Sequence, residues 1–389
     1  MRIEQPVVLL IRSLDVGGAE RQLVQLAIGL HRRGVRVLVV TFYDGGDLSA
    51  ELERAGVATR SLGKRGRWDL LGFLIRFVMV LRRARPAVAY GFLATGNTLL
   101  ALMRSLLPGA LIVWGLRASK VDLAKYDAAA RVSYWLERML CHVPDLVIAN
   151  SEAGRRHALA VGFPFQKVVV VPNGIDTQRF RLDESGRRRV RAEWGVGEAE
   201  PLIGLVARLD PMKDHSTFLR AVRLIAAEVP TARFVCVGDG PAPLRKSLED
   251  SAIELGVADR VLWSGQRQDM SAVFSALDVA CSASAFGEGF SNAVGEALSC
   301  AVPCVGTDVG DTRAIIGDTG RVVPPQDPEA LARGVVELLQ MPQAERTELG
   351  ARARARIVDN FSLDRLVDRT VAAWSVVRPD CCAPSEAGQ

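Results

Sequence analysis

The sequence predicts an α/β protein built from two doubly wound domains, each a parallel sheet covered by helices, with a central cleft between them. Short apolar runs alternate with longer helical patterns from one end of the chain to the other. Several runs are apolar on both faces, as parallel strands covered by helices should be. The length of 389 residues is too great for one ordinary core and fits two domains of common size.

The expected strands fall into two series, separated by a polar connector at residues 172–198 with a hinge near residues 172–181. The first series comprises Val7–Ile11, Val35–Thr41, Ala87–Tyr90, Leu111–Trp114, Leu146–Ala149 and Val168–Val171. The second comprises Ile203–Val206, Arg233–Val237, Val261–Trp263, Val279–Cys281 and Pro303–Gly306. The predicted domains are therefore residues 1–175 and residues 176–362.

Composition and local patterns exclude several classes of protein. Apolar residues make up 49% and charged residues 24%, which is a globular balance. The first strand is short and Arg12 follows it, so we expect no secretion signal and a cytoplasmic location. The longest uncharged stretch, residues 86–103, contains Pro86 and Gly91 and favours strand, loop and helix over a membrane span. The seven cysteines lack metal-binding spacing and are typical of a reduced interior.

Positive charge is concentrated in the first domain. Residues 1–120 hold 18 Lys and Arg against 8 Asp and Glu, and much of the surplus lies in residues 60–85. Aromatic and aliphatic residues are interleaved there with the basic ones, so two interpretations remain open. The segment is either a basic helix lying on the anionic inner face of a membrane or a core-packed helix with snorkelling arginines.

A glycine turn follows the first strand. Gly17 and Gly18 come between that strand and a helix expected at residues 21–30. Such glycines let backbone N–H groups approach a phosphate at a helix N-terminus, although a plain tight turn gives the same pattern.

Two cations follow the first strand of the second domain. Arg208 and Lys213 lie five residues apart at a strand end, just before the helix expected at residues 216–227. In that position they would offset the charge of a diphosphate; the alternative is a solvated basic loop. His215 fits the start of the helix better than a catalytic base. Turns containing Gly240 and Gly265 follow the next two strands. Their backbone would suit contact with a base or ribose, but the same turns are equally common as plain connections between elements.

The segment 284–298 contains the largest group of candidate ligand-binding residues. Glu288 precedes a Gly-Phe-Ser-Asn loop, and Glu296 lies in the early turns of the helix that follows. Carboxylates accept hydrogen bonds from sugar and ribose hydroxyls, and free N–H groups complement an anion or a sugar oxygen. A capped helix with a surface glutamate would explain Glu296, but it would not explain two glutamates, Glu288 and Glu296, on either side of this loop.

The motifs that are missing narrow the chemistry. There is no G-x-G-x-x-G fingerprint, which argues against a nicotinamide dehydrogenase, and no phosphate-binding loop of the NTPase type. There is also no Asp-x-Asp sequence and no histidine spacing to hold a metal. We therefore expect no metal and no cofactor, with protein cations meeting the leaving-group charge.

These residues together resemble a known family over nearly the whole chain, the retaining glycosyltransferase family 4 (glycosyl transferases group 1), whose GT-B architecture pairs two Rossmann-like domains. The matching segments are residues 17–20, 149–152, 171–176, 237–241, 322–325 and 327–328, the pair Arg208 and Lys213, and the pair Glu288 and Glu296. The resemblance implies a hexosyltransferase-type enzyme that uses a nucleotide-sugar donor and a cell-surface glycan or lipid-linked acceptor. It implies no nucleic-acid partner. It also implies that a C-terminal helix at about 363–380 crosses back and joins the first domain.

The same resemblance implies roles for individual residues. Arg208 and Lys213 would bind the donor diphosphate, and Glu296 would hold the ribose hydroxyls. Glu288 and the backbone of Gly289, Phe290, Ser291 and Asn292 would hold the transferred sugar. Gly18 would approach the phosphates from the first domain. The reaction would retain configuration by front-side attack, with the departing phosphate oxygen taking the acceptor proton.

The chain departs from the family in one place. Many relatives carry a histidine near the reacting sugar in the first domain, whereas residues 90–97 contain none. Thr95 or Asn97 would donate a hydrogen bond there instead. Arg117, after the next strand, would supply a cation or be a surface arginine.

Two other functions remain open at this level. A nucleotide-sugar 2-epimerase uses the same two-domain architecture, although no suitable cluster of carboxylates and histidines is evident. A non-catalytic nucleotide-sugar-binding partner would explain the missing histidine.

Overall fold

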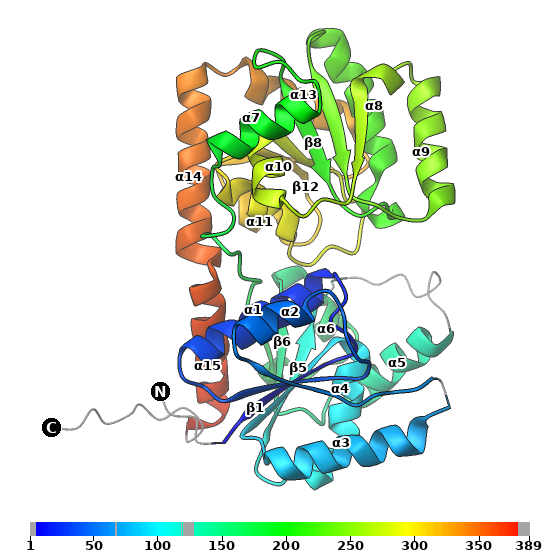
Figure 1. Cartoon of the computed structure of the whole chain (residues 1–389), viewed down its shortest axis with the longest axis vertical. Helices are drawn as coiled ribbons and strands as arrows, with labels where there is room; N and C mark the ends of the chain where they lie inside the picture. Colours follow the sequence, from blue (N-terminus) through cyan, green and yellow to red (C-terminus); the bar gives the residue numbers. More distant parts are fainter. Residues whose placement is uncertain (1–4, 67, 118, 120–127, 380–389) are drawn as a thin grey trace, which may run out of the picture. The chain divides into compact units, whose positions relative to one another are not determined.

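The computed structural model describes residues 5–66, 68–117, 119 and 128–379, and the chain folds into two compact units (Figure 1). The first comprises Met1–Gly174 with Leu363–Gln389, and the second comprises Ile175–Ser362. The expected division after residue 175 lies one residue from the observed one. Arg67, within the basic segment, and Cys381 and Cys382 lie outside the described residues.

The first unit contains a seven-stranded sheet, parallel throughout, in the order β3-β2-β1-β4-β5-β6-β7. Its strands are β1 (Val7–Ile11), β2 (Val37–Thr41), β3 (Ala58–Ser61), β4 (Val88–Phe92), β5 (Leu111–Leu116), β6 (Leu146–Ala149) and β7 (Val168–Val170). The strand order reverses between β1 and β4. A reversal of this kind opens a crevice at the carboxyl ends of the two strands, where ligands bind in doubly wound sheets.

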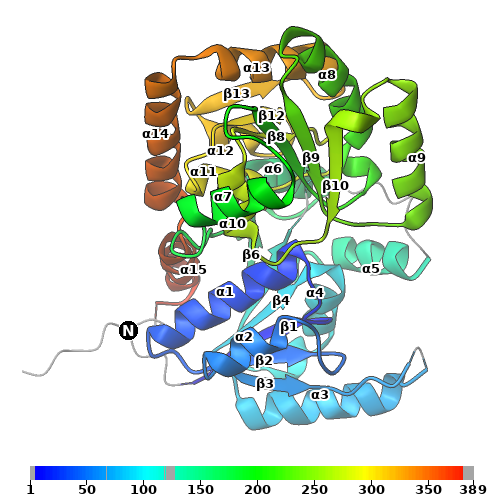
Figure 2. The same ribbon diagram turned by 45° about the horizontal axis from the view of Figure 1, so that its top comes forward.

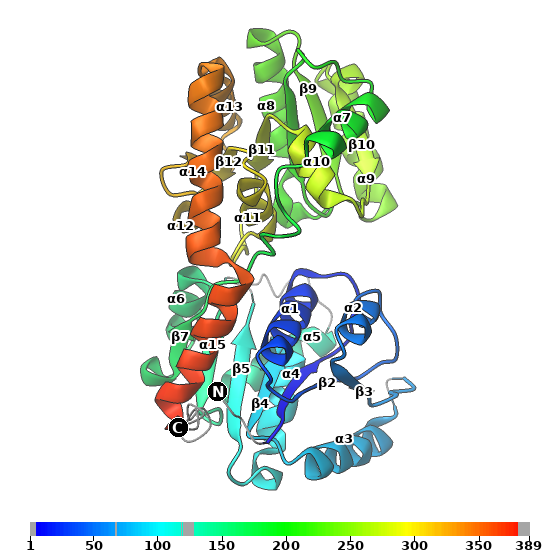
Figure 3. The same ribbon diagram turned by 60° about the vertical axis from the view of Figure 1, so that its left-hand side comes forward.

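Helices cover both faces of this sheet (Figure 3). They are α1 (Gly18–Arg32), α2 (Ser49–Arg54), α3 (Leu70–Ala84), α4 (Leu93–Leu102), α5 (Ala128–Met139), α6 (Glu152–Ala160) and α15 (Leu363–Val377). Alternate side chains of β1 point to opposite faces: Val7, Leu9 and Ile11 share a core with α1 and α15. Val8 and Leu10 share a second core with α3, α4 and α6. This division explains why β1 is apolar at every position.

Helix α15 returns to the first unit after the chain has completed the second, as the resemblance implied. Its Trp374 is fully buried against the core that β1 and α1 form. Arg33 at the end of α1 pairs with Asp364 and Asp368 of α15. A Cβ added to Gly29 would lie 2.5 Å from the Val367 side chain, so the absence of a side chain at Gly29 allows α1 and α15 to pack this closely.

The second unit contains a six-stranded parallel sheet in the order β10-β9-β8-β11-β12-β13, which reverses between β8 and β11 (Figure 2). Its strands are β8 (Leu202–Val206), β9 (Arg233–Val237), β10 (Val261–Gly265), β11 (Val279–Ser282), β12 (Cys304–Thr307) and β13 (Gly320–Val323). One core includes residues of α7 (Glu184–Glu193), α10 (Met270–Ala276), α11 (Asn292–Ser299), α12 (Thr312–Ile316) and α14 (Gln343–Phe361). The other includes residues of α8 (His215–Glu228), α9 (Ala242–Glu254) and α13 (Pro328–Gln340).

Strands β3 and β13 were not expected from the sequence. Both are edge strands: β3 is mostly exposed and β13 is half-buried along its length. An edge strand with little burial has no apolar run to reveal it. Among the described residues no helix is long and apolar enough to cross a membrane, and residues 86–103 form β4 and the ten-residue α4 with the turns around them. The five cysteines within the described part are free thiols in the interior.

Candidate functional site

The switch point of the second sheet carries an ion pair. Lys213 lies in the turn after β8, and Glu288 lies in the loop after β11, the strand on the other side of the reversal. The Lys213 Nζ donates to Glu288 Oε1 at 3.0 Å and to Oε2 at 2.7 Å. The two side chains are 21% and 8% exposed, so the pair is well shielded but still reachable from solvent. Two predicted site residues 75 positions apart therefore meet at the place where such sheets bind ligands.

Two aspartates build the turn that holds Lys213. Asp210 accepts hydrogen bonds from the Met212 backbone N–H at 2.9 Å and from Arg208 at 2.8 Å. Burial acts to raise the pKa of Asp210, but these two hydrogen bonds outweigh it and hold the pKa below the ordinary value. Asp214, in the left-handed region at φ 46°, caps α8 through its side chain. The single 3₁₀ turn between them places Lys213 at the strand end.

Close backbone packing supports the Glu288 loop. The Ser284 hydroxyl lies 3.4 Å from Glu288 Oε2, and the Ala285 N–H donates to the Met212 carbonyl at 2.9 Å. This last bond joins the two loops that carry the ion pair. A Cβ on Gly310 would lie 2.4 Å from the Glu288 carbonyl oxygen, so the β12–α12 turn can support the loop only with glycine there.

The other predicted cation and acid occupy less enclosed positions. Arg208 is paired with Asp210, and its side chain is 68% exposed, so it can swing toward a ligand at small cost. Glu296 is the fifth residue of α11, half-buried one turn beyond the helix start. The sequence placed it in the early turns of this helix, and the structure agrees.

The loop between the two glutamates presents backbone rather than side chains. Phe290 is 5% exposed and packs edge-on against Phe361 with ring centroids 5.4 Å apart. Its side chain therefore belongs to the core, which limits any ligand contact to its main chain. Gly289 precedes it, Ser291 is the N-cap of α11, and Asn292 is the first helical residue.

The predicted glycine turns interlock with the β8 turn. A Cβ on Gly240 would lie 2.5 Å from the Leu209 carbonyl oxygen. Gly265, at φ 68°, ends β10, and its carbonyl accepts from the Gly238 N–H at 2.9 Å. Packing alone therefore accounts for the need for glycine at 240, whether or not a base or ribose contacts it.

His215 is the first residue of α8, as predicted, and is 3% exposed. Burial, with the nearby Lys213 charge, lowers its pKa to about 4, so the imidazole is neutral at neutral pH. Its Nε2 has no hydrogen-bond partner in the described part of the chain.

The first unit has its own switch point, where β1 and β4 end. Gly17 is the extended N-cap of α1 at φ −152°, and Gly18 is the first helical residue. A Cβ on Gly17 would lie 2.0 Å from a carboxylate oxygen of Glu20, so a side chain there would have to displace that glutamate. The amides of this helix start point out of the carboxyl edge of the sheet.

The structure corrects the expectation for Asn97. Its side chain is fully buried: Nδ2 donates to the Gly115 carbonyl at 3.2 Å and to Glu137 at 2.6 Å. Its Oδ1 accepts from the Gly115 N–H at 3.2 Å. Both amide hydrogens are thus used internally, and Asn97 orients its neighbours instead of reaching an acceptor. Thr95 is exposed on α4 and lies 3.4 Å from the Ser133 hydroxyl.

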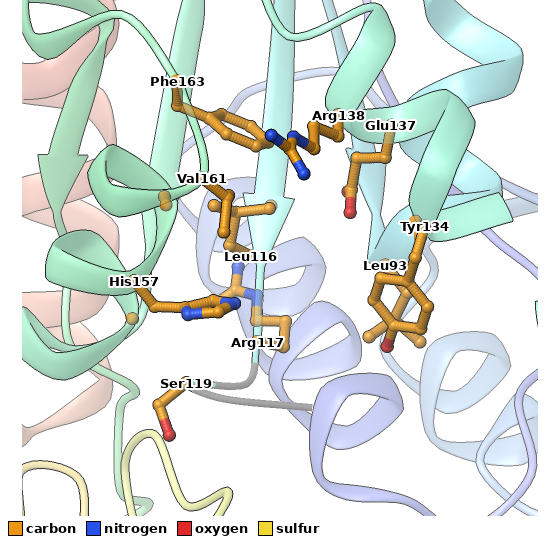
Figure 4. A pocket seen from close by; sticks show the side chains of 14 residues that line it. Leu93, Leu116, Arg117, Ser119, Tyr134, Glu137, Arg138, His157, Val161 and Phe163 are labelled. Atoms are coloured by element: carbon orange, nitrogen blue, oxygen red, sulfur yellow. The ribbon is translucent and has the colours of Figure 1, made fainter. Parts of the chain in front are cut away.

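Arg117 is held by residues that no sequence pattern connects with it. It donates to the Tyr90 hydroxyl at 2.8 Å and to Asn173 Oδ1 at 3.3 Å. Its guanidinium lies over the Phe92 ring, 4.3 Å from the centroid. Tyr90 and Phe92 are alternate residues of β4, so both point to the same face, but only the pairing of β4 with β5 brings them to Arg117. Arg117 also lines a cavity of about 220 Å³ in the first unit (Figure 4).

Each unit is thus a doubly wound α/β domain with polar or glycine-rich turns at the switch point of its sheet, an arrangement that defines a class of nucleotide-binding proteins. Among the described residues no group of three or more His, Cys, Asp or Glu side chains is placed to hold a metal ion.

Comparison with known proteins identifies the family. The family model described as Glycosyltransferase Family 4 matches residues 16–179, and that described as Glycosyl transferases group 1 matches residues 200–341. A D-inositol 3-phosphate glycosyltransferase of Kineococcus radiotolerans is 30% identical over 92% of this chain and 90% of its own length. An N-acetyl-alpha-D-glucosaminyl L-malate synthase of Bacillus anthracis is 28% identical over 60% of each chain. The Anabaena protein HepE, solved with UDP-glucose, superposes with a TM-score of 0.82 at 21% identity, covering 96% of this chain and all of HepE.

The chain belongs to glycosyltransferase family 4, with the two Rossmann-like domains of the GT-B architecture. It is a glycosyltransferase.

Proposed function

We propose that this enzyme transfers a sugar, with retention of configuration, from a nucleoside-diphosphate sugar to a hydroxyl of a cell-surface glycan or lipid-linked acceptor, without a metal ion. The observation that carries the proposal is the Lys213–Glu288 pair at the switch point of the second sheet. A cation and a carboxylate in contact match the two halves of such a donor, an anionic pyrophosphate and a hydroxyl-rich sugar.

Donor binding would give Lys213 and Glu288 new hydrogen-bond partners. A diphosphate oxygen would take the place of the Glu288 carboxylate as acceptor for the Lys213 ammonium, which releases Glu288 to accept hydrogen bonds from sugar hydroxyls. Arg208, whose side chain is exposed, would add a second cation, and the amides at the start of α11 would add partial positive charge. These groups would stabilise the charge that develops on the leaving phosphate. Glu296 would hold the ribose hydroxyls.

Retention follows from a front-side reaction. The departing phosphate oxygen takes the proton of the acceptor hydroxyl as the new bond forms on the same face of an oxocarbenium-like sugar. A dedicated protein base is then unnecessary, which fits a buried His215 whose pKa, lowered to about 4, makes it a weak base.

The relatives support the donor class. HepE was solved with UDP-glucose, and the Kineococcus and Bacillus relatives are named for glycosyl transfer to inositol 3-phosphate and to malate. The present chain shares the fold of the first and the family of the others.

A thermal-shift screen with UDP-, GDP- and ADP-sugars tests the donor, because a ligand that binds only the folded state raises the melting temperature by an amount that grows with the ratio of its concentration to its Kd. The stabilising donor is then incubated with membrane extract, and the anomeric configuration of the product is read by NMR. Absence of stabilisation, donor hydrolysis and transfer across the panel would refute the proposal. Isomerisation of the free donor without acceptor would indicate an epimerase instead.

We also propose that α3 contacts an anionic membrane surface, where a lipid-linked acceptor would reside. In all three whole-chain views α3 lies at the periphery of the first unit, beside β3 (Figures 1–3). Leu71 and Ile75 are 74% and 50% exposed on one side of α3, and Trp68 just before it is 88% exposed. A hollow of about 350 Å³ beside this stripe is lined by Arg60, Arg76 and Arg83. Exposed apolar residues next to clustered cations are typical of interfacial helices.

Sedimentation with vesicles tests this contact. We expect the wild-type chain to bind vesicles containing anionic phospholipid and not neutral ones, with binding weakened by salt. Replacing Leu71 and Ile75 by Glu should abolish binding, whereas Ile253→Glu, at a site 66% exposed in the second unit, should not. Equal binding of wild type and the double variant would exclude this surface.

A further inference from the structure

Within the described part of the chain, Arg117 is a shielded cation without a carboxylate partner. Its hydrogen bonds go to the Tyr90 hydroxyl and the Asn173 amide oxygen, both on neutral side chains. Its Nε is inaccessible to solvent and has no hydrogen-bond partner in the described part of the chain. None of the carboxylates that the structure describes forms an ion pair with Arg117. Burial raises the pKa of Tyr90 despite the adjacent guanidinium, so the phenol does not supply the missing negative charge.

Such an arrangement is costly unless a ligand completes it. Taking a guanidinium out of water without a counter-ion carries a penalty that neutral hydrogen bonds and an aromatic face offset only in part. Arginine stays protonated in proteins, so the charge cannot be removed by titration. The positive charge therefore persists at the wall of the cavity and favours an anion there.

The cavity that Arg117 lines has two kinds of surface (Figure 4). Leu93, Leu116 and Phe163 give it an apolar wall. Arg138 of α5 and His157 of α6 line the same cavity as Arg117 and add further donors. Its volume of about 220 Å³ lies near the lower end for small-molecule sites, so it suits a small ligand or one end of a larger one. It opens beside the carboxyl ends of β4 and β5, the functional edge of this sheet.

We propose that this cavity binds an anionic group of the acceptor, a carboxylate or a phosphate monoester, against Arg117, with the adjoining carbon skeleton against Leu93, Leu116 and Phe163. The inference rests on the proposed transferase function and adds to it the chemical class of the acceptor. Arg117 is the anchoring residue. Asn97, by holding Glu137 and the end of β5, is a positioning residue.

Glu137 makes this binding depend on pH. It lines the same cavity as Arg117, and burial raises its pKa to about 7 although the Asn97 hydrogen bond acts to lower it. The titratable and charged groups lining the same cavity are Arg117 from β5, Tyr134 and Arg138 from α5 and His157 from α6. A protonated Glu137 does not repel an anion, whereas an ionised one does. Anion affinity should therefore fall as the pH rises through about 7.

The test measures binding of phenyl phosphate, benzoate and the neutral benzyl alcohol to the full chain by isothermal titration calorimetry. We expect the two anions to bind and benzyl alcohol not to bind. Arg117→Gln should weaken the anions by about 10- to 100-fold, as for loss of a charged hydrogen-bonding group. Arg32→Gln, an exposed arginine of the same unit, should leave binding unchanged. Lys213→Ala should also leave it unchanged, which excludes binding at the diphosphate site of the second unit.

Three results would overturn the inference: equal binding of benzyl alcohol and the anions, no anion binding by the wild type, or loss of binding in Lys213→Ala rather than Arg117→Gln. The wild-type comparison requires no variant, and Arg117→Lys keeps the charge if Arg117→Gln does not fold. Failure of this inference is distinct from failure of the proposed function. The latter would appear as absence of donor binding and donor hydrolysis, which do not involve Arg117.

Discussion

At the scale of single residues, the Lys213–Glu288 contact combines two needs of a donor site. It pairs a shielded lysine with a shielded carboxylate, and it places both where a ligand can replace either partner. A buried charge left without its partner is strongly unfavourable, so each residue stabilises the other before the donor arrives.

Lys213→Ala should reduce turnover by about 10²- to 10³-fold, the usual loss when one stabilising donor is removed from a developing oxyanion. Steady-state transfer with the stabilising donor measures it, and circular dichroism confirms that the variant is folded. Lys246→Ala, on a side chain 79% exposed, is the matched control and should keep full activity. Retained turnover in Lys213→Ala would remove this residue from the mechanism.

Glu137 should make stability depend on pH. Because its pKa is raised from 4.5 to about 7 in the folded chain, the folded state binds the proton more tightly between these values. The free energy of unfolding should therefore fall as pH rises through this window, by about 3 kcal/mol in total.

Glu137→Gln keeps an acceptor for the Asn97 amide but has no titratable proton. The variant should therefore remove the decrease in the free energy of unfolding that Glu137 causes as the pH rises. Urea unfolding at pH 5 and pH 8 measures the difference, with the exposed Glu254→Gln as control. If the free energy of unfolding changed by the same amount between pH 5 and pH 8 in Glu137→Gln and in the wild type, the raised pKa of Glu137 would be contradicted.

At the scale of elements, α15 stabilises the first unit although it is distant in sequence from the strands it covers. The Trp374 ring meets Tyr90 edge-on at 6.2 Å, which connects this helix to the strand residue that holds Arg117. Looser packing of α15 would therefore disturb Tyr90 in β4 as well as the core.

Trp374→Ala should destabilise the chain by about 3–5 kcal/mol through the cavity that it leaves. Denaturant unfolding measures the loss, and hydrogen exchange should show it in α1 and β4. Val376→Ala changes a side chain 84% exposed on the same helix and should be nearly neutral. Equal effects of the two substitutions would mean that α15 does not pack as described.

At the scale of the whole molecule, we propose that the site depends on protein cations rather than on a bound metal ion. We therefore expect the rate of sugar transfer to be unchanged by excess EDTA and not restored or raised by added Mg²⁺ or Mn²⁺. A transfer assay with dialysed enzyme measures both. Loss of activity in EDTA, recovered with a divalent ion, would show that the diphosphate requires a metal.

Most of the strands and helices and the second-domain motif positions could be predicted from sequence patterns, and the return of the last helix was implied by the family resemblance. Periodicity and turn residues are local signals, and β1 and β8 are apolar because both of their faces are buried. Edge strands β3 and β13 lacked that signal, since β3 is mostly exposed and β13 is only half-buried. The single-residue expectation that failed, Asn97, had a polar side chain at a plausible position but gave no indication of what surrounds it.

What the sequence determined by itself was therefore the class of fold and the candidate residues, because these depend on neighbours along the chain. Only the tertiary structure decided which candidates meet. It brings Lys213 into contact with Glu288, and it uses both amide hydrogens of Asn97 in hydrogen bonds to Gly115 and Glu137. It also leaves Arg117 at the wall of a cavity, with no carboxylate partner in the described part of the chain. Those outcomes depend on strand order and helix packing between residues far apart in sequence, which no local pattern encodes.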